Sequence, residues 1–119
     1  MIAATILWAA IVFCLHVLRL NSDQEKLHLI PHADKLVHFT MFAVLAFCMV
    51  HALMQGGLWM SRYVLLVFFS CMAYGAGLEY LQGAYFEGRD SDPLDWFADM
   101  IGTIFALLGA RWLSLKRSV

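Results

Sequence analysis

Charged residues are scarce in this sequence of 119 residues: they make up 14% of it, against 62% hydrophobic residues. Soluble domains of this size carry about 25% charged and about 45–50% apolar residues. The chain therefore has too little polar surface to cover a soluble core, and lipid is the natural alternative solvent. The mean hydropathy of +0.72 points the same way.

An excess of basic charge is also missing. Eight lysines and arginines face nine acidic residues, so the net charge is −1, and a nucleic-acid partner is not expected because such proteins present a basic face. No CxxC spacing occurs among the three cysteines. Cys14, Cys48 and Cys71 each lie inside an apolar run, where a cysteine usually acts as a small, inert hydrophobe.

Segments of alternating polarity are absent, and four long apolar runs stand in their place. Each run approaches the ~20 residues that cross a hydrocarbon core ~30 Å thick. Because lipid cannot satisfy unpaired backbone groups, helices are the expected spanning form. We therefore predict an all-α fold with one domain over residues 1–119, an integral membrane bundle of four transmembrane helices at about residues 2–18, 36–54, 63–81 and 94–113.

The first run, Ile2–Leu18, has no basic segment before it, so we expect it to persist as a span rather than to be cleaved as a signal peptide. Four spans place both termini on one side of the membrane. Basic residues near the span ends divide almost evenly between the two sides. The basic tail at Arg111, Lys116 and Arg117 tips the prediction towards cytoplasmic termini.

Ionisable residues open the second span. Such residues are costly in a bilayer and mark a structural or functional need. Asp34 and His38 are four residues apart and share one helix face. One interpretation is a capping carboxylate beside a hydrogen-bonded histidine, and the other is a proton carrier or ligand, His38, oriented by Asp34. The remaining histidines show no ligand spacing and are assigned no role: His16, His28, His32 and His51.

A lone carboxylate closes the third span. Glu79 follows a long apolar run, and Gln82 lies three residues further on the same helix face. Glu79 needs a partner inside the bundle, and Arg89 or His38 would supply one if the ends of the second and third spans meet. A structural ion pair and a catalytic role are equally open for Glu79.

The last span opens with two carboxylates. Asp95 and Asp99 lie one helical turn apart, and small residues continue their stripe at Gly102, Ala106 and Ala110. Such a small-residue seam lets another helix pack closely, so the carboxylates are predicted on the packed face. Two like charges at this spacing repel each other unless a cation lies between them. Two interpretations are open. Asp95 and Asp99 belong to a functional cluster, which could hold a divalent cation, or they belong to a structural network at the helix end that is held by Arg89.

In order and spacing, these residues resemble the VanZ-like family of small bacterial membrane proteins. The resemblance covers residues 34–102 and consists of Asp34-Lys35-x-x-His38-Phe39, Glu79-x-x-Gln82, Arg89 and Asp95-x-x-x-Asp99-x-x-Gly102. The sequence departs at Asp99, where the family usually has asparagine. The resemblance implies a multi-pass protein of the bacterial inner (plasma) membrane that works in the cell envelope, with a link to tolerance of the glycopeptide teicoplanin. The resemblance does not indicate which reaction, if any, the protein catalyses.

Binding of an anionic envelope lipid or a glycan (peptidoglycan) precursor is the first functional hypothesis. Lys35 and Arg89 would meet a phosphate, because arginine offers a planar fork that suits such groups. Glu79, Gln82 and Asp95 would hold the polar headgroup. Membrane lipid is thus the expected partner.

Two other hypotheses stay open. An enzyme acting on a phospholipid or polyprenyl-phosphate substrate would use His38 and Asp34 as acid and base, with Asp95 and Asp99 as a second pair or a divalent-metal site. No nucleophile or metal signature supports that assignment. A structural subunit would use the charges only to pin its own helices or those of a homo-oligomer or larger membrane complex.

Overall fold

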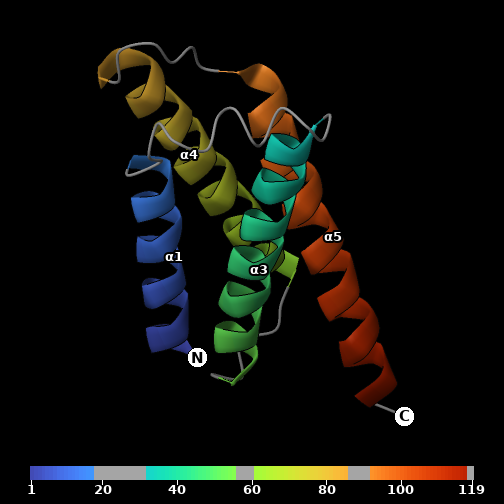
Figure 1. Cartoon of the computed structure of the whole chain (residues 1–119). Coiled ribbons are helices and arrows are strands. Elements are labelled where there is room, and N and C mark those ends of the chain that lie inside the picture. The colour runs from blue at the N-terminus through green and yellow to red at the C-terminus, as the bar shows by residue number, and fades with distance from the viewer. Residues whose placement is uncertain (18–31, 56–60, 86–91, 118–119) are drawn as a thin grey trace.

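The computed structural model describes residues 1–17, 32–55, 61–85 and 92–117, and these segments form four helices and no strand (Figure 1). The helices are α1 (Ile2–Val17), α3 (Ala33–Gln55), α4 (Ser61–Tyr85) and α5 (Pro93–Arg117). The predicted all-α helical bundle is confirmed.

Three of these helices contain a segment of 23 residues that is long and apolar enough to cross a membrane: Ala33–Gln55, Tyr63–Tyr85 and Pro93–Leu115. Helix α1 is more apolar than these three helices but has 16 residues, which at 1.5 Å per residue extend over about 24 Å. Large apolar side chains cover the outside of the bundle, including Phe69, Phe105 and Leu108, each more than 60% exposed. Apolar surface of this extent needs lipid around it, and the chain is a membrane protein.

The helices run past the apolar segments from which they were predicted. Helix α3 begins at Ala33, ahead of the predicted span, and α4 continues to Tyr85. Hydropathy marks where lipid contact ends, whereas a helix continues until its backbone groups find other partners. At the start of helix α5 a side chain provides such a partner: Asp92 Oδ1 accepts a hydrogen bond of 2.9 Å from the backbone N–H of Leu94. Pro93, which has no N–H to satisfy, occupies the first helical position.

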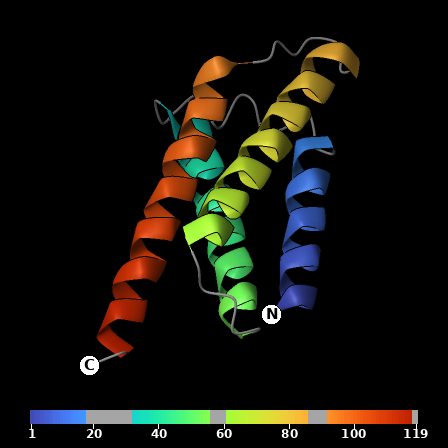
Figure 2. The same ribbon diagram turned by 180° about the vertical axis from the view of Figure 1, so that it is seen from behind.

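Helix α3 lies at the centre of the bundle, between α1 and α5, and contacts the other three helices (Figures 1 and 2). Helix α5 packs mainly on α3. The N- and C-termini lie at one end of the bundle, and the start of α3, the end of α4 and the start of α5 lie at the other (Figure 1). Residues from distant parts of the sequence thus meet at the end away from the termini.

Small residues bring the backbones of α3 and α5 together. A Cβ atom added to Gly102 would collide with the backbone carbonyl oxygen of Phe39. Ala106 and Ala110, one and two turns further along α5, are also buried. Because no side chain separates the backbones at Gly102, α3 and α5 lie in close contact at the level of Phe39 and Gly102, and this fixes their relative register.

Aromatic side chains tie the helices to one another by donating to backbone carbonyls. The indole N–H of Trp8 in α1 donates to the carbonyl of Met41 in α3 over 3.0 Å. Two further bonds follow the same pattern, from the Tyr74 hydroxyl to the Ala9 carbonyl at 2.7 Å and from the Trp96 indole to the Met72 carbonyl at 3.1 Å. Each bond satisfies a polar group that lipid would leave unpaired.

Candidate functional site

Lys35 lies among three carboxylates at the start of α3. Its Nζ atom is 3.1 Å from Asp34 Oδ2, 2.9 Å from Asp92 Oδ2 and 3.0 Å from Asp95 Oδ1. An ammonium group has three N–H donors, and each carboxylate takes one of them. The hydrogen-bonding capacity of Lys35 is therefore used within the protein, and it joins the start of α3 to the start of α5.

His38 lies between two carboxylates of α5. Its Nδ1 atom is 3.0 Å from Asp99 Oδ1, and its Nε2 atom is 3.6 Å from Asp95 Oδ2. The side chains of His38 and Asp99 are 4% and 1% exposed, so the shorter contact is shielded from solvent. A carboxylate accepts only, so His38 Nδ1 carries the hydrogen of this bond.

Asp92 caps α5 and also contacts Lys35 of α3 and Glu79 of α4. Its carboxylate accepts from Lys35, and its backbone N–H donates to Glu79 Oε2 over 3.2 Å. The Lys35 ammonium, helped by the backbone N–H of Leu94, holds the pKa of the Asp92 carboxyl below its usual value. Asp92 therefore couples the start of α5 to α3 and to the end of α4.

Glu79 is buried near the end of α4, and only half of its carboxylate is satisfied within the described residues. Oε2 accepts from Asp92, whereas Oε1 is buried and has no hydrogen-bond partner among the described segments. His16, from the end of α1, is also buried and approaches the same place. The His16 and His38 rings meet edge to face, with their centroids 4.9 Å apart.

A pocket of about 120 Å³ opens beside these two histidines. Its lining combines three apolar residues with three polar ones: Leu15, Val37, Met41, His16, His38 and Gln82. These residues come from α1, α3 and α4. The pocket thus offers an apolar wall and hydrogen-bonding groups in one place.

The structure brings together most of the side chains that the sequence singled out. Contacts among described residues link Asp34, Lys35, His38, Asp95 and Asp99 directly, and Glu79 joins them through the backbone of Asp92. Gln82 is buried in the pocket wall, and Gly102, Ala106 and Ala110 lie buried on α5. Arg89 lies outside the described residues.

Two details differ from the sequence hypotheses. Asp34, expected to orient His38, pairs with Lys35, and the carboxylate bonded to His38 is that of Asp99. His16, for which the sequence indicates no role, belongs to the cluster. Its partners lie on other helices, so no spacing within the sequence could indicate them; its only signal is a histidine near the end of an apolar run.

These observations define a class: a helical membrane protein with a partly buried, mainly acidic cluster at one end of the bundle. Comparison with protein-family models, with curated protein sequences and with solved structures gives no match.

Proposed function

We propose that the protein binds an envelope lipid, or a lipid-linked glycan precursor, at the cluster end of the bundle. The observation that carries the proposal is the pocket between α1, α3 and α4, whose lining is partly apolar and partly polar. Ligand sites commonly have this character, with apolar walls and a few polar groups that fix orientation. The resemblance to the VanZ-like family supports work in the cell envelope, and tolerance of glycopeptides such as teicoplanin would be one consequence.

In this proposal, the apolar part of the ligand lies against Leu15, Val37 and Met41. The polar headgroup meets the pocket's other side, where Gln82 offers both an amide N–H₂ and a carbonyl oxygen. A chain lying on the outside of α3 would continue directly into the surrounding lipid.

The charges of the described cluster favour a headgroup rich in hydroxyls. Lys35 already donates to three carboxylates, so it has no donor left for a phosphate. Carboxylates accept hydrogen bonds from hydroxyl groups, and those of Glu79 and Asp95 are close to the pocket residue His38. In this proposal a phosphate contact, where the ligand has one, belongs to Arg89 or to a bound cation.

An enzyme acting on such a lipid is a second candidate, favoured by one specific contact. His38 is bonded to the buried carboxylate of Asp99, and a histidine oriented by a carboxylate is a common general base. Release of phosphate or of a sugar from a polyprenyl-linked substrate by the purified protein, lost in Asp99→Ala, would support this role. A preparation that binds such a substrate without converting it would instead support binding alone.

The binding proposal is tested by blocking the pocket. Val37 lines the pocket, and its neighbour Leu36 is also exposed but does not line it. Native mass spectrometry of detergent-solubilised protein, with polyprenyl phosphate, a polyprenyl-linked sugar and phosphatidylglycerol as probes, measures binding directly. Val37→Trp is expected to weaken binding by at least about tenfold, which equals about 1.4 kcal/mol.

Leu36→Trp is the matched control, because it adds the same side chain one residue away and should leave binding unchanged. Equal binding by the wild type and Val37→Trp would contradict the proposed pocket. Binding of none of the three probes by the wild-type protein would leave the structural-subunit hypothesis as the better account.

A further inference from the structure

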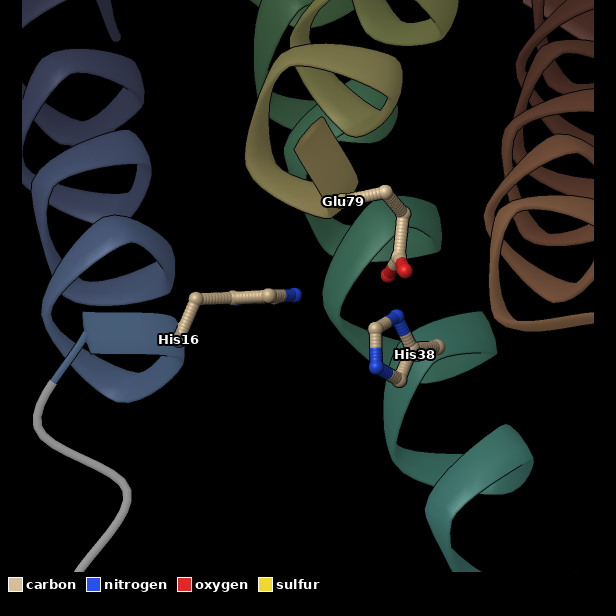
Figure 3. A group of neighbouring side chains, drawn as sticks. All are labelled: His16, His38 and Glu79. Carbon is tan, nitrogen blue, oxygen red and sulfur yellow. The ribbon is translucent and has the colours of Figure 1, made fainter. Parts of the chain in front are cut away.

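Three buried side chains from three different helices converge beside the pocket. They are His16 from α1, His38 from α3 and Glu79 from α4, and one potential ligand atom from each lies within 4.8 Å of the others (Figure 3). Their exposed fractions are 4%, 3% and 7%. We propose that His16, His38 and Glu79 form a binding site for a divalent transition-metal ion, for which Zn²⁺ is the best match.

The unpaired oxygen of Glu79 gives independent support. Oε1 is buried without a hydrogen-bond partner in the described part of the chain, while Oε2 is bonded to the backbone of Asp92. A buried carboxylate oxygen without a partner is costly, and a cation is the partner that compensates best. Figure 3 shows the Glu79 carboxylate directed towards His38, with the His16 ring approaching from the side.

Each histidine is oriented for metal binding by a bond through its other nitrogen. His16 Nδ1 lies 2.8 Å from the carbonyl oxygen of Val12, and His38 Nδ1 lies 3.0 Å from Asp99 Oδ1. Both acceptors need a hydrogen on Nδ1, so a neutral ring carries its lone pair on Nε2. Hydrogen bonding of the second ring nitrogen to a carbonyl or a carboxylate is the usual arrangement around metal-binding histidines.

The charges near His38 also suit a divalent cation. Asp95 Oδ2 lies 3.6 Å from His38 Nε2, so an ion bound at Nε2 has a second carboxylate beside it. Together with Glu79 and Asp99, this surrounds the site with negative charge.

A second acidic group in the described structure is already filled. The carboxylates of Asp34, Asp92 and Asp95 also lie close enough to hold an ion, but the Lys35 ammonium occupies their centre at 2.9–3.1 Å. The site that remains open to a metal ion is therefore the one formed by His16, His38 and Glu79. It differs from the cation position between Asp95 and Asp99 that the sequence suggested.

The ligand types decide which metal fits. Imidazole nitrogen with one carboxylate suits Zn²⁺, Co²⁺ and related ions, whereas Mg²⁺ and Ca²⁺ prefer oxygen ligands throughout. Zinc bonds to such ligands are about 2.0–2.1 Å long, so tetrahedral ligand atoms lie about 3.4 Å apart. The candidate ligand atoms lie within 4.8 Å of one another, so the side chains would have to draw together by at most about 1.4 Å to bind a zinc ion. Three protein ligands leave a fourth position for water or for a ligand in the adjoining pocket.

The test is a metal titration of the full chain in detergent without added lipid, after treatment with a chelator. Isothermal titration with Zn²⁺, checked by elemental analysis after dialysis, should give one ion per chain, and Mg²⁺ and Ca²⁺ should give no binding. His16→Ala and Glu79→Gln should each weaken Zn²⁺ binding by about 100-fold or more, since loss of even an outer-shell partner costs about 10- to 100-fold.

His51→Ala is the matched control. His51 lies on α3 about 20 Å from His38, where it stacks on Phe47 at 5.4 Å. Its substitution should leave Zn²⁺ binding unchanged. A wild-type protein that binds no Zn²⁺, or a loss in His51→Ala equal to that in His16→Ala, would overturn the proposed site.

X-ray absorption of the zinc-loaded wild type needs no variant to fold. Two imidazoles with oxygen ligands are expected, and sulfur in the first shell would overturn the assignment because it would point to the cysteines. The site does not depend on the proposed lipid function. Zinc binding without lipid binding would contradict only that function, and lipid binding in the presence of chelator with no zinc binding would contradict only this inference.

Discussion

The imidazole of His38 and the carboxylate of Asp99 join α3 to α5 through a contact of 3.0 Å between Nδ1 and Oδ1. The two residues are 61 positions apart in the sequence, and both are almost completely buried. Asp99 Oδ2 has no hydrogen-bond partner within the described residues. The pairing with His38 is therefore the main compensation for burying the Asp99 carboxylate in this end of the bundle.

Two replacements of Asp99 should distinguish the contribution of its charge to stability from the contribution of its hydrogen bond to His38. Asp99→Asn keeps an oxygen that accepts from His38, so we expect a loss of roughly 1–2 kcal/mol in the free energy of unfolding. Asp99→Ala removes the acceptor and leaves His38 buried without its partner, for an expected loss of about 3–5 kcal/mol. Unfolding by SDS titration in mixed micelles measures both. Equal losses in the two variants would contradict the role given to this hydrogen bond.

Lys35 should be needed to hold three carboxylates together. Lys35→Met leaves Asp34, Asp92 and Asp95 close to one another without a cation, and we expect a loss of about 1–3 kcal/mol, since the site is partly exposed. Lys35→Arg keeps the charge and should lose less. The same SDS titration compares the variants, and an unchanged stability in Lys35→Met would show that the ion pairs contribute nothing.

Close packing at Gly102 should be sensitive to a single methyl group. In Gly102→Ala the new Cβ would meet the carbonyl oxygen of Phe39, so α3 and α5 must move apart, and we expect a loss of at least about 2 kcal/mol. Gly109→Ala on the same helix is the control, because nothing lies within 4 Å of its added Cβ. That control should be neutral or more stable by up to about 1 kcal/mol. The reverse order of the two effects would contradict the described helix packing.

Acidification should weaken the cap of α5. The Lys35 ammonium lowers the pKa of Asp92 from its ordinary value of 3.8, so the charged form is stabilised in the folded protein. The stabilisation is complete above that ordinary value and is lost as the pH falls through the lowered one. Melting temperatures of the wild type and Asp92→Asn should therefore differ at pH 7 and converge towards pH 3. A constant difference over this range would contradict the assigned ion pair.

The helical class could be predicted because the apolar runs are long enough to cross a bilayer as helices and the sequence lacks the alternating polarity of membrane strands. The sequence also indicated Lys35, His38, Asp95 and Asp99, since charged groups inside apolar runs must find partners. Pairing was harder to predict. The spacing of Asp34 and His38 suggested a local contact, but Asp34 bonds to Lys35 and the partner of His38 comes from α5.

Contacts between helices explain what the sequence could not show. His16 joins the cluster because α1 packs against α3, and Asp92 does so because the start of α5 reaches the end of α4. Neither relation leaves a periodic pattern in the chain. Gly102 could be recognised as a packing residue from the small-residue seam, whereas its contact with the backbone of Phe39 depends on the register of two helices.

Side chains that are distant in the sequence form one energetically coupled cluster, and a double-mutant cycle between His38→Ala and Asp99→Ala measures that coupling. Each single variant leaves one buried polar partner without the other, and the double variant removes both. We predict a coupling of about 1–3 kcal/mol in the free energy of unfolding, with the double variant less destabilised than the sum of the single variants. Losses that add to within about 0.5 kcal/mol would mean that the two side chains do not meet, and would contradict the account.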